Sequence, residues 1–115
     1  MHVLLVEDHE ETRTILTRLL AHWGYDVVAA DSVRSALDFL ANFRFDALVS
    51  DIGLPDGDGL QVVAAAKKMH APTIAVALSA YGEAADREAG QRAGFDHYLT
   101  KPFDAHRLRC ALTAA

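Results

Sequence analysis

The sequence predicts an α/β domain in which five parallel strands form one sheet and helices cover both of its faces. Three observations lead to this fold class. Short apolar runs alternate with longer amphipathic segments along all 115 residues, which is typical of strand–helix–strand units. The apolar runs are nearly continuous, as expected for strands that are buried on both faces. Turn-forming residues separate the two kinds of segment.

The first half of the chain contains three of the strands and two helices. Residues 10–23 have the helical spacing of apolar side chains, and Gly24 ends that helix. Ser32 is placed to cap the second helix. The strands are expected over residues 2–6, 25–29 and 47–50. The side chains expected to face the core are Ile15, Leu16, Leu19, Leu20 and Trp23 in the first helix, and Val33, Ala36, Leu37 and Leu40 in the second.

The second half continues the same alternation. Residues 54–59 have the composition of a turn, and Asp104 is placed to cap the last helix. Two further helices are expected over 60–69 and 83–93, and two strands over 73–78 and 95–99. The apolar stripe of the 83–93 helix consists of alanines, which bury little area, so we expect that helix to be held loosely.

Composition restricts the class of protein. The net charge is −5, which does not suggest a nucleic-acid surface. No apolar run reaches the length of a membrane span, and the N-terminus lacks the pattern of a signal peptide. The single cysteine, Cys110, fits a small apolar position on the last helix and a reducing compartment. We therefore expect a cytoplasmic domain that makes no membrane contact of its own.

Acidic residues follow two of the predicted strands. Glu7 and Asp8 come directly after the first strand, and Asp51 follows the third. In the strand order 2-1-3-4-5 these two strands are neighbours at the switch point, where ligands bind. Three carboxylates at one place repel one another unless a cation neutralises them, and Mg²⁺ suits such a set because it keeps waters that a phosphate replaces. The six histidines have no spacing typical of a metal site.

Two further side chains follow the remaining strands. Ser79 ends the fourth strand, where its hydroxyl is placed to bond an oxygen of a phosphoryl group on Asp51. Lys101 comes after the fifth strand, where it is placed to pair first with the Asp51 carboxylate and then with the phosphoryl group. A serine at a strand end is usually a turn residue, so the prediction depends on all of these residues together.

In this order and spacing the motifs resemble the receiver domain of two-component response regulators, over essentially the whole chain. The motifs are Leu4-Leu5-Val6-Glu7-Asp8, Ser50-Asp51-Ile52-Gly53-Leu54-Pro55-Asp56-Gly57-Asp58-Gly59, Leu78-Ser79-Ala80 and Leu99-Thr100-Lys101-Pro102. The resemblance implies a flavodoxin-like (βα)5 three-layer sandwich that forms one receiver domain over residues 1–115. Glu7 stands where many receivers have an aspartate, and its longer side chain allows the cation to be held through water.

The resemblance also implies the chemistry. Asp51 would accept a phosphoryl group from a phosphohistidine of a histidine kinase or a phosphotransfer domain, and the domain would assist both this transfer and its own dephosphorylation. Glu7, Asp8, Asp51 and the Gly53 carbonyl would surround Mg²⁺. Ser79 and Lys101 would sense the phosphoryl group, and Tyr98 would be the switch aromatic. The responding surface would comprise the 83–93 helix, the fifth strand and the last helix, and a homodimer through it is one expected outcome.

The context of the domain has two interpretations. The stretches 49–57 and 93–102 resemble receivers fused to the end of hybrid sensor histidine kinases, which we favour. The alternative is a stand-alone single-domain response regulator, because the sequence contains no helix-turn-helix segment, second catalytic domain or linker.

Three other classes fit the sequence less well. A flavin or dinucleotide binder needs a phosphate-binding loop after the first strand, whereas Glu7-Asp8-His9-Glu10-Glu11 repels phosphate. A phosphohydrolase of the haloacid-dehalogenase type needs a second aspartate two residues after its nucleophile, and position 53 is glycine. A phosphate-independent interaction module would be expected to lack Asp51 or Lys101.

Overall fold

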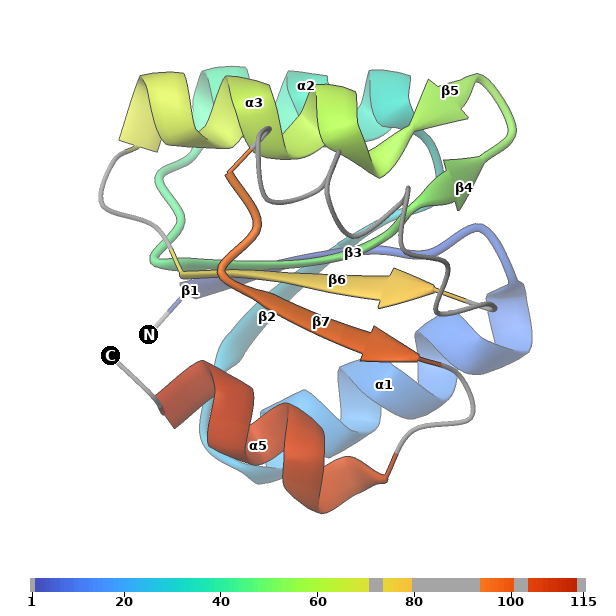
Figure 1. The fold of residues 1–115 in the computed structure, drawn as a ribbon, viewed down its shortest axis with the longest axis vertical. Helices are drawn as coiled ribbons and strands as arrows, with labels where there is room; N and C mark the ends of the chain where they lie inside the picture. The colour runs from blue at the N-terminus through green and yellow to red at the C-terminus, as the bar shows by residue number, and fades with distance from the viewer. Residues whose placement is uncertain (1, 71–73, 80–93, 101–103, 114–115) are drawn as a thin grey trace.

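A five-stranded parallel sheet lies at the centre of the computed structural model, which describes residues 2–70, 74–79, 94–100 and 104–113 (Figure 1). Its strand order is β2-β1-β3-β6-β7. The strands are β1 (His2–Val6), β2 (Asp26–Ala30), β3 (Ala47–Asp51), β6 (Ile74–Ser79) and β7 (His97–Thr100). All neighbouring strands are parallel. The predicted flavodoxin-like class, with an open parallel sheet, is confirmed.

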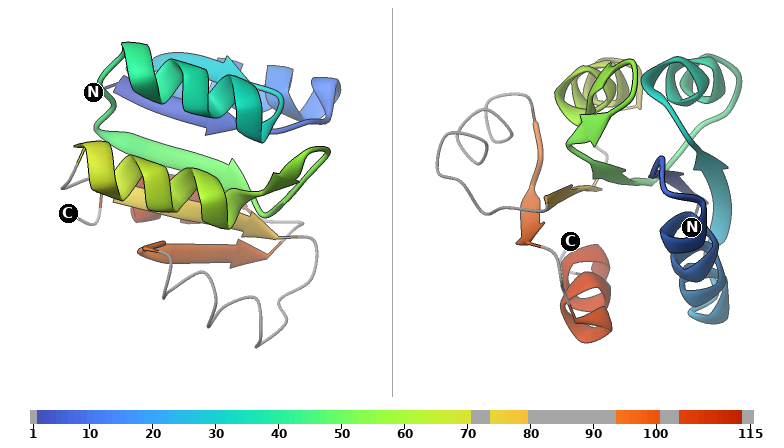
Figure 2. Two further views of the ribbon diagram at one scale, coloured as in Figure 1. Left: turned by 90° about the horizontal axis from the view of Figure 1, so that it is seen from above. Right: turned by 90° about the vertical axis from the view of Figure 1, so that its right-hand side faces the viewer.

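Helices cover both faces of this sheet, as Figure 2 shows. The helices α1 (Glu10–His22) and α5 (Ala105–Thr113) lie on one face, and α2 (Val33–Asn42) and α3 (Gly59–His70) lie on the other. The helix predicted over 83–93 lies outside the described residues. Among those that are described, no helix is long and apolar enough to cross a membrane.

The core has two parts, one on each side of the sheet, and β1 contributes to both. Leu4 and Val6 pack toward α2 and α3, whereas Val3 and Leu5 pack toward α1 and α5. All four side chains are buried completely. Because neighbouring strand residues point to opposite faces, a continuous apolar run is what a strand between two helical layers requires.

Two side chains predicted to face the core are exposed instead. Ile15 in α1 is 63% exposed, and Leu37 in α2 is 38% exposed. Each lies about 100° around its helix from a buried neighbour, Leu16 for Ile15 and Ala36 for Leu37. The buried faces are centred on Leu16 and Leu20 in α1, and on Ala36 and Leu40 in α2. The helical spacing was therefore predicted correctly, but the width of the buried face was overestimated.

The segment predicted as a turn over 54–59 contains a short antiparallel hairpin. Its strands are β4 (Gly53–Leu54) and β5 (Gly57–Asp58), paired to each other and not to the main sheet. This hairpin comes between β3 and β6 in the chain. The predicted strand order 2-1-3-4-5 therefore becomes β2-β1-β3-β6-β7, because the hairpin strands are counted as β4 and β5. Strand ends also differ by one or two residues from the prediction, because the pairing of neighbouring strands determines them.

The predicted caps of two helices are present. Ser32 accepts a hydrogen bond from the Ser35 N–H at 3.1 Å, and the Ser35 hydroxyl in turn accepts one from the Ser32 N–H. Asp104 accepts a bond from the His106 N–H at 2.7 Å, at the start of α5. Cys110 lies on α5 as expected, but it is exposed there.

Candidate functional site

The register of the sheet places the ends of its strands at one edge. Val6 is paired with Ser50, Asp51 with Leu78, and Ser79 with Thr100. Glu7 follows the first of these pairs directly. Since parallel strands run in the same direction, the residues that follow β1, β3 and β6 meet at the carboxyl edge, where ligands bind in such sheets.

The segment after β1 brings three potential ligands together. Ligand atoms of Glu7, Asp8 and His9 all lie within 4.8 Å of one another. Glu7 is buried completely, whereas Asp8 and His9 are exposed. The His9 N–H donates to a Glu7 carboxylate oxygen at 3.3 Å. Among the described residues Asp51 is not part of this close group.

Arg13, a residue of α1, holds the segment Glu7-Asp8, which we call the acidic segment. Its Nη1 donates to the carbonyl oxygen of Glu7 at 3.1 Å and to that of Asp8 at 3.3 Å. The Glu7 N–H donates to the Ala30 carbonyl at 3.0 Å, which ties the end of β1 to the end of β2. The backbone that carries both carboxylates is therefore held from two sides. The guanidinium also places a positive charge beside a negative segment.

Asp51 is the last residue of β3 and is 9% exposed. The Ile52 N–H donates to Asp51 Oδ1 at 3.1 Å and to the Leu78 carbonyl at 3.0 Å. The Ser50 hydroxyl donates to the Asp51 carbonyl at 2.9 Å. These bonds orient both the backbone and the carboxylate of Asp51.

The chain after Asp51 leaves the sheet and then returns close to it. Gly53 is exposed in β4. The Gly59 N–H donates to the Ile52 carbonyl at 2.8 Å, which closes the loop at its base. A Cβ atom at Gly59 would overlap the Asp51 carbonyl oxygen and lie 3.0 Å from the Ser50 hydroxyl. The close approach of α3 to the end of β3 thus requires glycine here.

The remaining predicted site residues lie farther along the same edge or outside the described part. Ser79 ends β6 and is 5% exposed. Tyr98 in β7 is half-buried, packs against the core on the side of α2 and α3, and has a buried hydroxyl oxygen. Lys101 lies outside the described residues, so its position relative to Asp51 stays a prediction.

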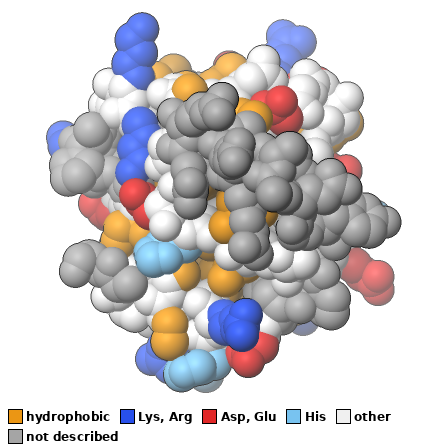
Figure 3. Space-filling view, viewed as in Figure 1, with side chains coloured by type: hydrophobic (Ala, Val, Ile, Leu, Met, Phe, Trp, Pro, Cys, Tyr) orange, Lys and Arg blue, Asp and Glu red, His pale blue; other side chains and the backbone are white. Residues whose placement is uncertain are grey.

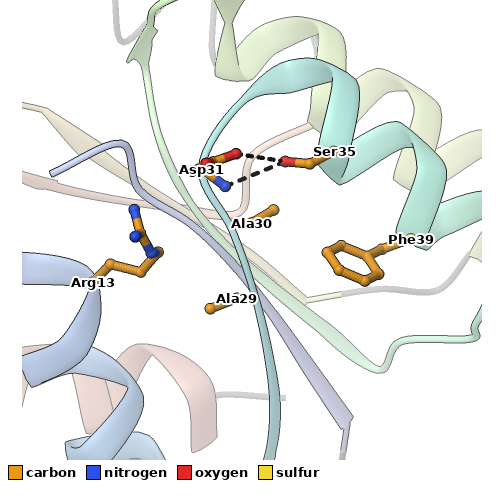
Figure 4. A pocket seen from close by; sticks show the side chains of 6 residues that line it. All are labelled: Arg13, Ala29, Ala30, Asp31, Ser35 and Phe39. Atoms are coloured by element: carbon orange, nitrogen blue, oxygen red, sulfur yellow. Dashed lines mark hydrogen bonds between the residues drawn. The ribbon is translucent and has the colours of Figure 1, made fainter. Parts of the chain in front are cut away.

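A pocket of about 290 Å³ lies beside the acidic segment, at the β2 edge of the sheet. Figure 4 shows Arg13 on one side of it, and Asp31, Ser35 and Phe39 on the other. The Ser35 hydroxyl donates to Asp31 Oδ1 at 3.1 Å. Arg13 therefore serves both the backbone of the acidic segment and the wall of this pocket.

The donor set at the carboxyl edge fits a hard divalent cation. Glu7, Asp8 and Asp51 carry carboxylate oxygens there, and Gly53 is exposed two residues after Asp51. Mg²⁺ and Ca²⁺ prefer oxygen ligands of these kinds. Three carboxylates at one edge also make a cation favourable, because they repel one another.

Three residues that the structure places around this edge were not predicted from the sequence. His9 joins the close group with Glu7 and Asp8. Arg13 bonds the backbone of the acidic segment, and Asp56 bonds the start of α2. The position of Arg13, one turn into the helix after the acidic pair, was the only available signal for it. No sequence pattern indicates the contact of Asp56 with residues more than twenty positions earlier.

The face of the molecule toward α3 and α5 has a mixed character. Figure 3 shows apolar, basic and histidine side chains interspersed between these two helices. His97 on β7 is half-buried, and Arg107 on α5 is exposed. Within the described part of the chain, β7 pairs with β6, with Ser79 opposite Thr100.

Comparison with known proteins identifies the family. The family model described as the response regulator receiver domain matches residues 3–113. The KDP operon transcriptional regulatory protein KdpE of Escherichia coli is 36% identical over 114 residues, which are 99% of this chain and 50% of that protein. The chain thus spans about half the length of this curated relative.

Solved structures agree with the family match. A response regulator from Burkholderia pseudomallei, with a phosphorylated aspartic acid and a calcium ion, has a TM-score of 0.91 and 26% identity over 97% of this chain and 66% of that chain. The receiver domain of a sensor histidine kinase from Pseudomonas aeruginosa, with magnesium in its active site cleft, has a TM-score of 0.87 and 30% identity over 98% of this chain and 94% of that chain. The chain therefore belongs to the response regulator receiver domain family and is a receiver domain of two-component signalling.

Proposed function

We propose that Asp51 is the phosphoacceptor of this receiver domain and takes a phosphoryl group from a phosphohistidine of a histidine kinase or a phosphotransfer domain. The observation that carries this proposal is the place of Asp51 at the carboxyl edge. It ends β3, the strand that pairs with β1 immediately before Glu7 and Asp8. Among the described residues, no other aspartate ends a strand of the five-stranded sheet.

The reaction we propose is a displacement at phosphorus. Asp51 Oδ2 attacks, the bond from phosphorus to the imidazole nitrogen breaks, and the imidazole leaves with that electron pair. The Ile52 N–H bonds Oδ1 and so orients the attacking oxygen. Positioning of this kind, with stabilisation of the charge on the transferred group, accounts for most of the catalysis in phosphoryl transfer.

The proposed cation is Mg²⁺, bound by Glu7, Asp8, Asp51 and the Gly53 carbonyl. When bound, it would neutralise charge on the phosphoryl oxygens. Arg13 holds the backbone of Glu7 and Asp8, and complete burial restricts the Glu7 side chain. The backbone of both residues and the Glu7 side chain are therefore held before the cation arrives, which lowers the entropy that binding must overcome.

We further propose a switch at the other end of the site. Ser79 would bond the phosphoryl oxygens, Lys101 would pair with them, and Tyr98 would change its packing in response. The responding surface would comprise the segment 83–93, β7 and α5. A helix over 83–93 would complete the (βα)5 fold. This surface would offer a site for a homodimer or another partner. Phosphorylation adds about −1.5 to −2 charges at neutral pH.

The receiver of a hybrid sensor histidine kinase is the context we propose. The similarity to the Pseudomonas aeruginosa kinase receiver supports it. A stand-alone response regulator is the second candidate. In each case we expect the domain to work in the cytoplasm, without contacting nucleic acid or membrane itself.

Direct mapping of the phosphoryl group tests the central proposal. After incubation with Mg²⁺ and acetyl phosphate, we expect the intact mass to show one added phosphoryl group. Reduction of the acyl phosphate with borohydride, followed by peptide mapping, should place it at Asp51. Modification at any other residue, or no modification with several small-molecule and phosphohistidine donors, would contradict the assignment.

The switch has its own test in amide chemical shifts. With beryllofluoride as phosphoryl mimic, we expect changes to extend through residues 79–107, beyond the residues that touch the cation. Ser79→Ala should keep the changes near Asp51 and lose most of the distant ones, because its hydroxyl links the two regions. Distant changes that persist in Ser79→Ala would rule out this role of the hydroxyl.

A further inference from the structure

We propose that Asp56 is a positioning residue for the metal and phosphoryl site: it ties the tip of the β4–β5 hairpin to the first turn of α2 and so holds the segment that carries Gly53. This inference rests on the proposed function, because it concerns the same site. Asp56 itself touches neither the cation nor the phosphoryl group in this proposal.

The contact consists of two hydrogen bonds from one carboxylate. Asp56 Oδ1 accepts from the Val33 N–H at 2.8 Å, and Oδ2 accepts from the Arg34 N–H at 3.0 Å. The first N–H groups of a helix have no partner within the helix, and they favour a negative charge. The first turn of α2 therefore presents N–H groups that are oriented to donate to the Asp56 carboxylate.

The ionisation of Asp56 agrees with this contact. The hydrogen bonds from the Arg34 and Val33 N–H groups lower the pKa of Asp56 from its ordinary value of 3.8. A lowered carboxyl pKa means that the folded protein favours the ionised form. The contribution of the contact to stability is therefore complete above the ordinary pKa of 3.8, and it is lost as the pH falls through the lowered pKa. The tie is thus present throughout the neutral range.

Among the described residues, the other side-chain hydrogen bonds of the hairpin join Asp58 to Gln61 in the first turn of α3. Each strand has two residues, and an isolated two-stranded hairpin is marginally stable in water. Gly53 and Gly57 add backbone freedom in the unfolded state. The base is anchored, since Ile52 and Leu54 pack against the core and the Gly59 N–H bonds the Ile52 carbonyl. Asp56 at the exposed tip makes the described hydrogen bonds between the hairpin and α2.

The tie leads back to the acidic segment through a short length of chain. Val33 follows Ala30, the last residue of β2, by three positions, and the Ala30 carbonyl accepts the Glu7 N–H at 3.0 Å. Asp56 therefore connects the loop after β3 with the adjoining ends of β2 and β1. Gly53 lies in the hairpin at one end of this connection, and Glu7 and Asp8 follow β1 at its other end.

Removal of the tie should weaken metal binding without unfolding the domain. We expect Asp56→Ala to raise the Mg²⁺ dissociation constant about tenfold, at the low end of what loss of an outer partner costs a metal site. The rate of phosphorylation by acetyl phosphate at subsaturating Mg²⁺ should fall by a similar factor. Asp56→Asn retains one acceptor oxygen, so its effect should be intermediate.

The matched control is Ser32→Ala, which removes a cap from the same helix. Ser32 bonds the Ser35 N–H and has no described contact with the hairpin. Both variants therefore lose capping of α2, but only Asp56→Ala releases the tip of the hairpin. Asp38→Ala, which removes an exposed acid from α2, controls for the change in net charge.

Three measurements separate the outcomes. Amide order in the metal-free protein should fall at residues 53–57 in Asp56→Ala and stay unchanged in both controls. Mg²⁺ titration by amide shifts and phosphorylation rates should follow the same pattern. Equal effects of Asp56→Ala and Ser32→Ala would show that Asp56 is a helix cap only, and unchanged order at 53–57 would overturn the proposal. If the parent protein is not phosphorylated at Asp51, the proposed function fails, but the order and metal-affinity measurements still decide the role of Asp56.

Discussion

Asp51→Asn is expected to abolish phosphorylation by acetyl phosphate and by phosphohistidine donors while leaving the fold intact. The amide keeps the shape of the side chain, and its oxygen can still accept the Ile52 N–H bond. It removes the attacking carboxylate oxygen and one of the charges that favour a cation. We therefore expect loss of the phosphoryl adduct in the intact mass, weaker Mg²⁺ binding, and an unfolding temperature that does not fall.

The control for this result is Asp38→Asn, which removes a carboxylate from the exposed side of α2. This variant should be phosphorylated at the parental rate. If Asp51→Asn is still phosphorylated at the parental rate, the phosphoacceptor lies elsewhere. A loss that is accompanied by unfolding, detected by circular dichroism, would show instead that Asp51 is needed for the structure.

Gly59→Ala is expected to destabilise the domain, although alanine usually favours a helix. The added Cβ would overlap the Asp51 carbonyl oxygen and lie 3.0 Å from the Ser50 hydroxyl. The first of these is backbone of a central strand, so α3 or β3 must shift. Overpacking of this kind costs about 1–3 kcal/mol, which corresponds to a fall in unfolding temperature of about 4 °C for each kcal/mol.

Gly53→Ala is the matched control for stability. No atom lies within 4 Å of the position that its Cβ would take, so its unfolding temperature should stay close to that of the parent. Thermal unfolding followed by circular dichroism measures both variants under one condition. Equal stability of the two variants would show that α3 does not pack as closely on the end of β3 as the structure indicates.

Local sequence patterns were sufficient where one element and its immediate surroundings determine the result. β1 was predicted correctly because a continuous apolar run fits only a strand between two layers. The cap at Ser32 was predicted correctly because a capping side chain bonds an N–H three residues away. The placement of Glu7 and Asp51 at one edge follows from the direction of parallel strands.

Features that depend on how helices pack were predicted less well. Ile15 has the spacing of a buried residue but is exposed, because the number of core residues around α1 decides the width of its buried face. The hairpin β4–β5 was read as a turn, since glycine, proline and aspartate favour turns with and without paired strands.

The sequence by itself determined the class of the fold, the family and the chemical character of the site, because these depend on residue types in a given order along strands and helices. Tertiary structure alone decided which groups support that site. Arg13 reaches the Glu7 and Asp8 carbonyls only because α1 turns back beside β1. Asp56 reaches the first turn of α2 only because α2 and α3 lie side by side on one face of the sheet. Contacts between residues far apart in the chain depend on the packing of whole elements, and local residue patterns do not encode that packing.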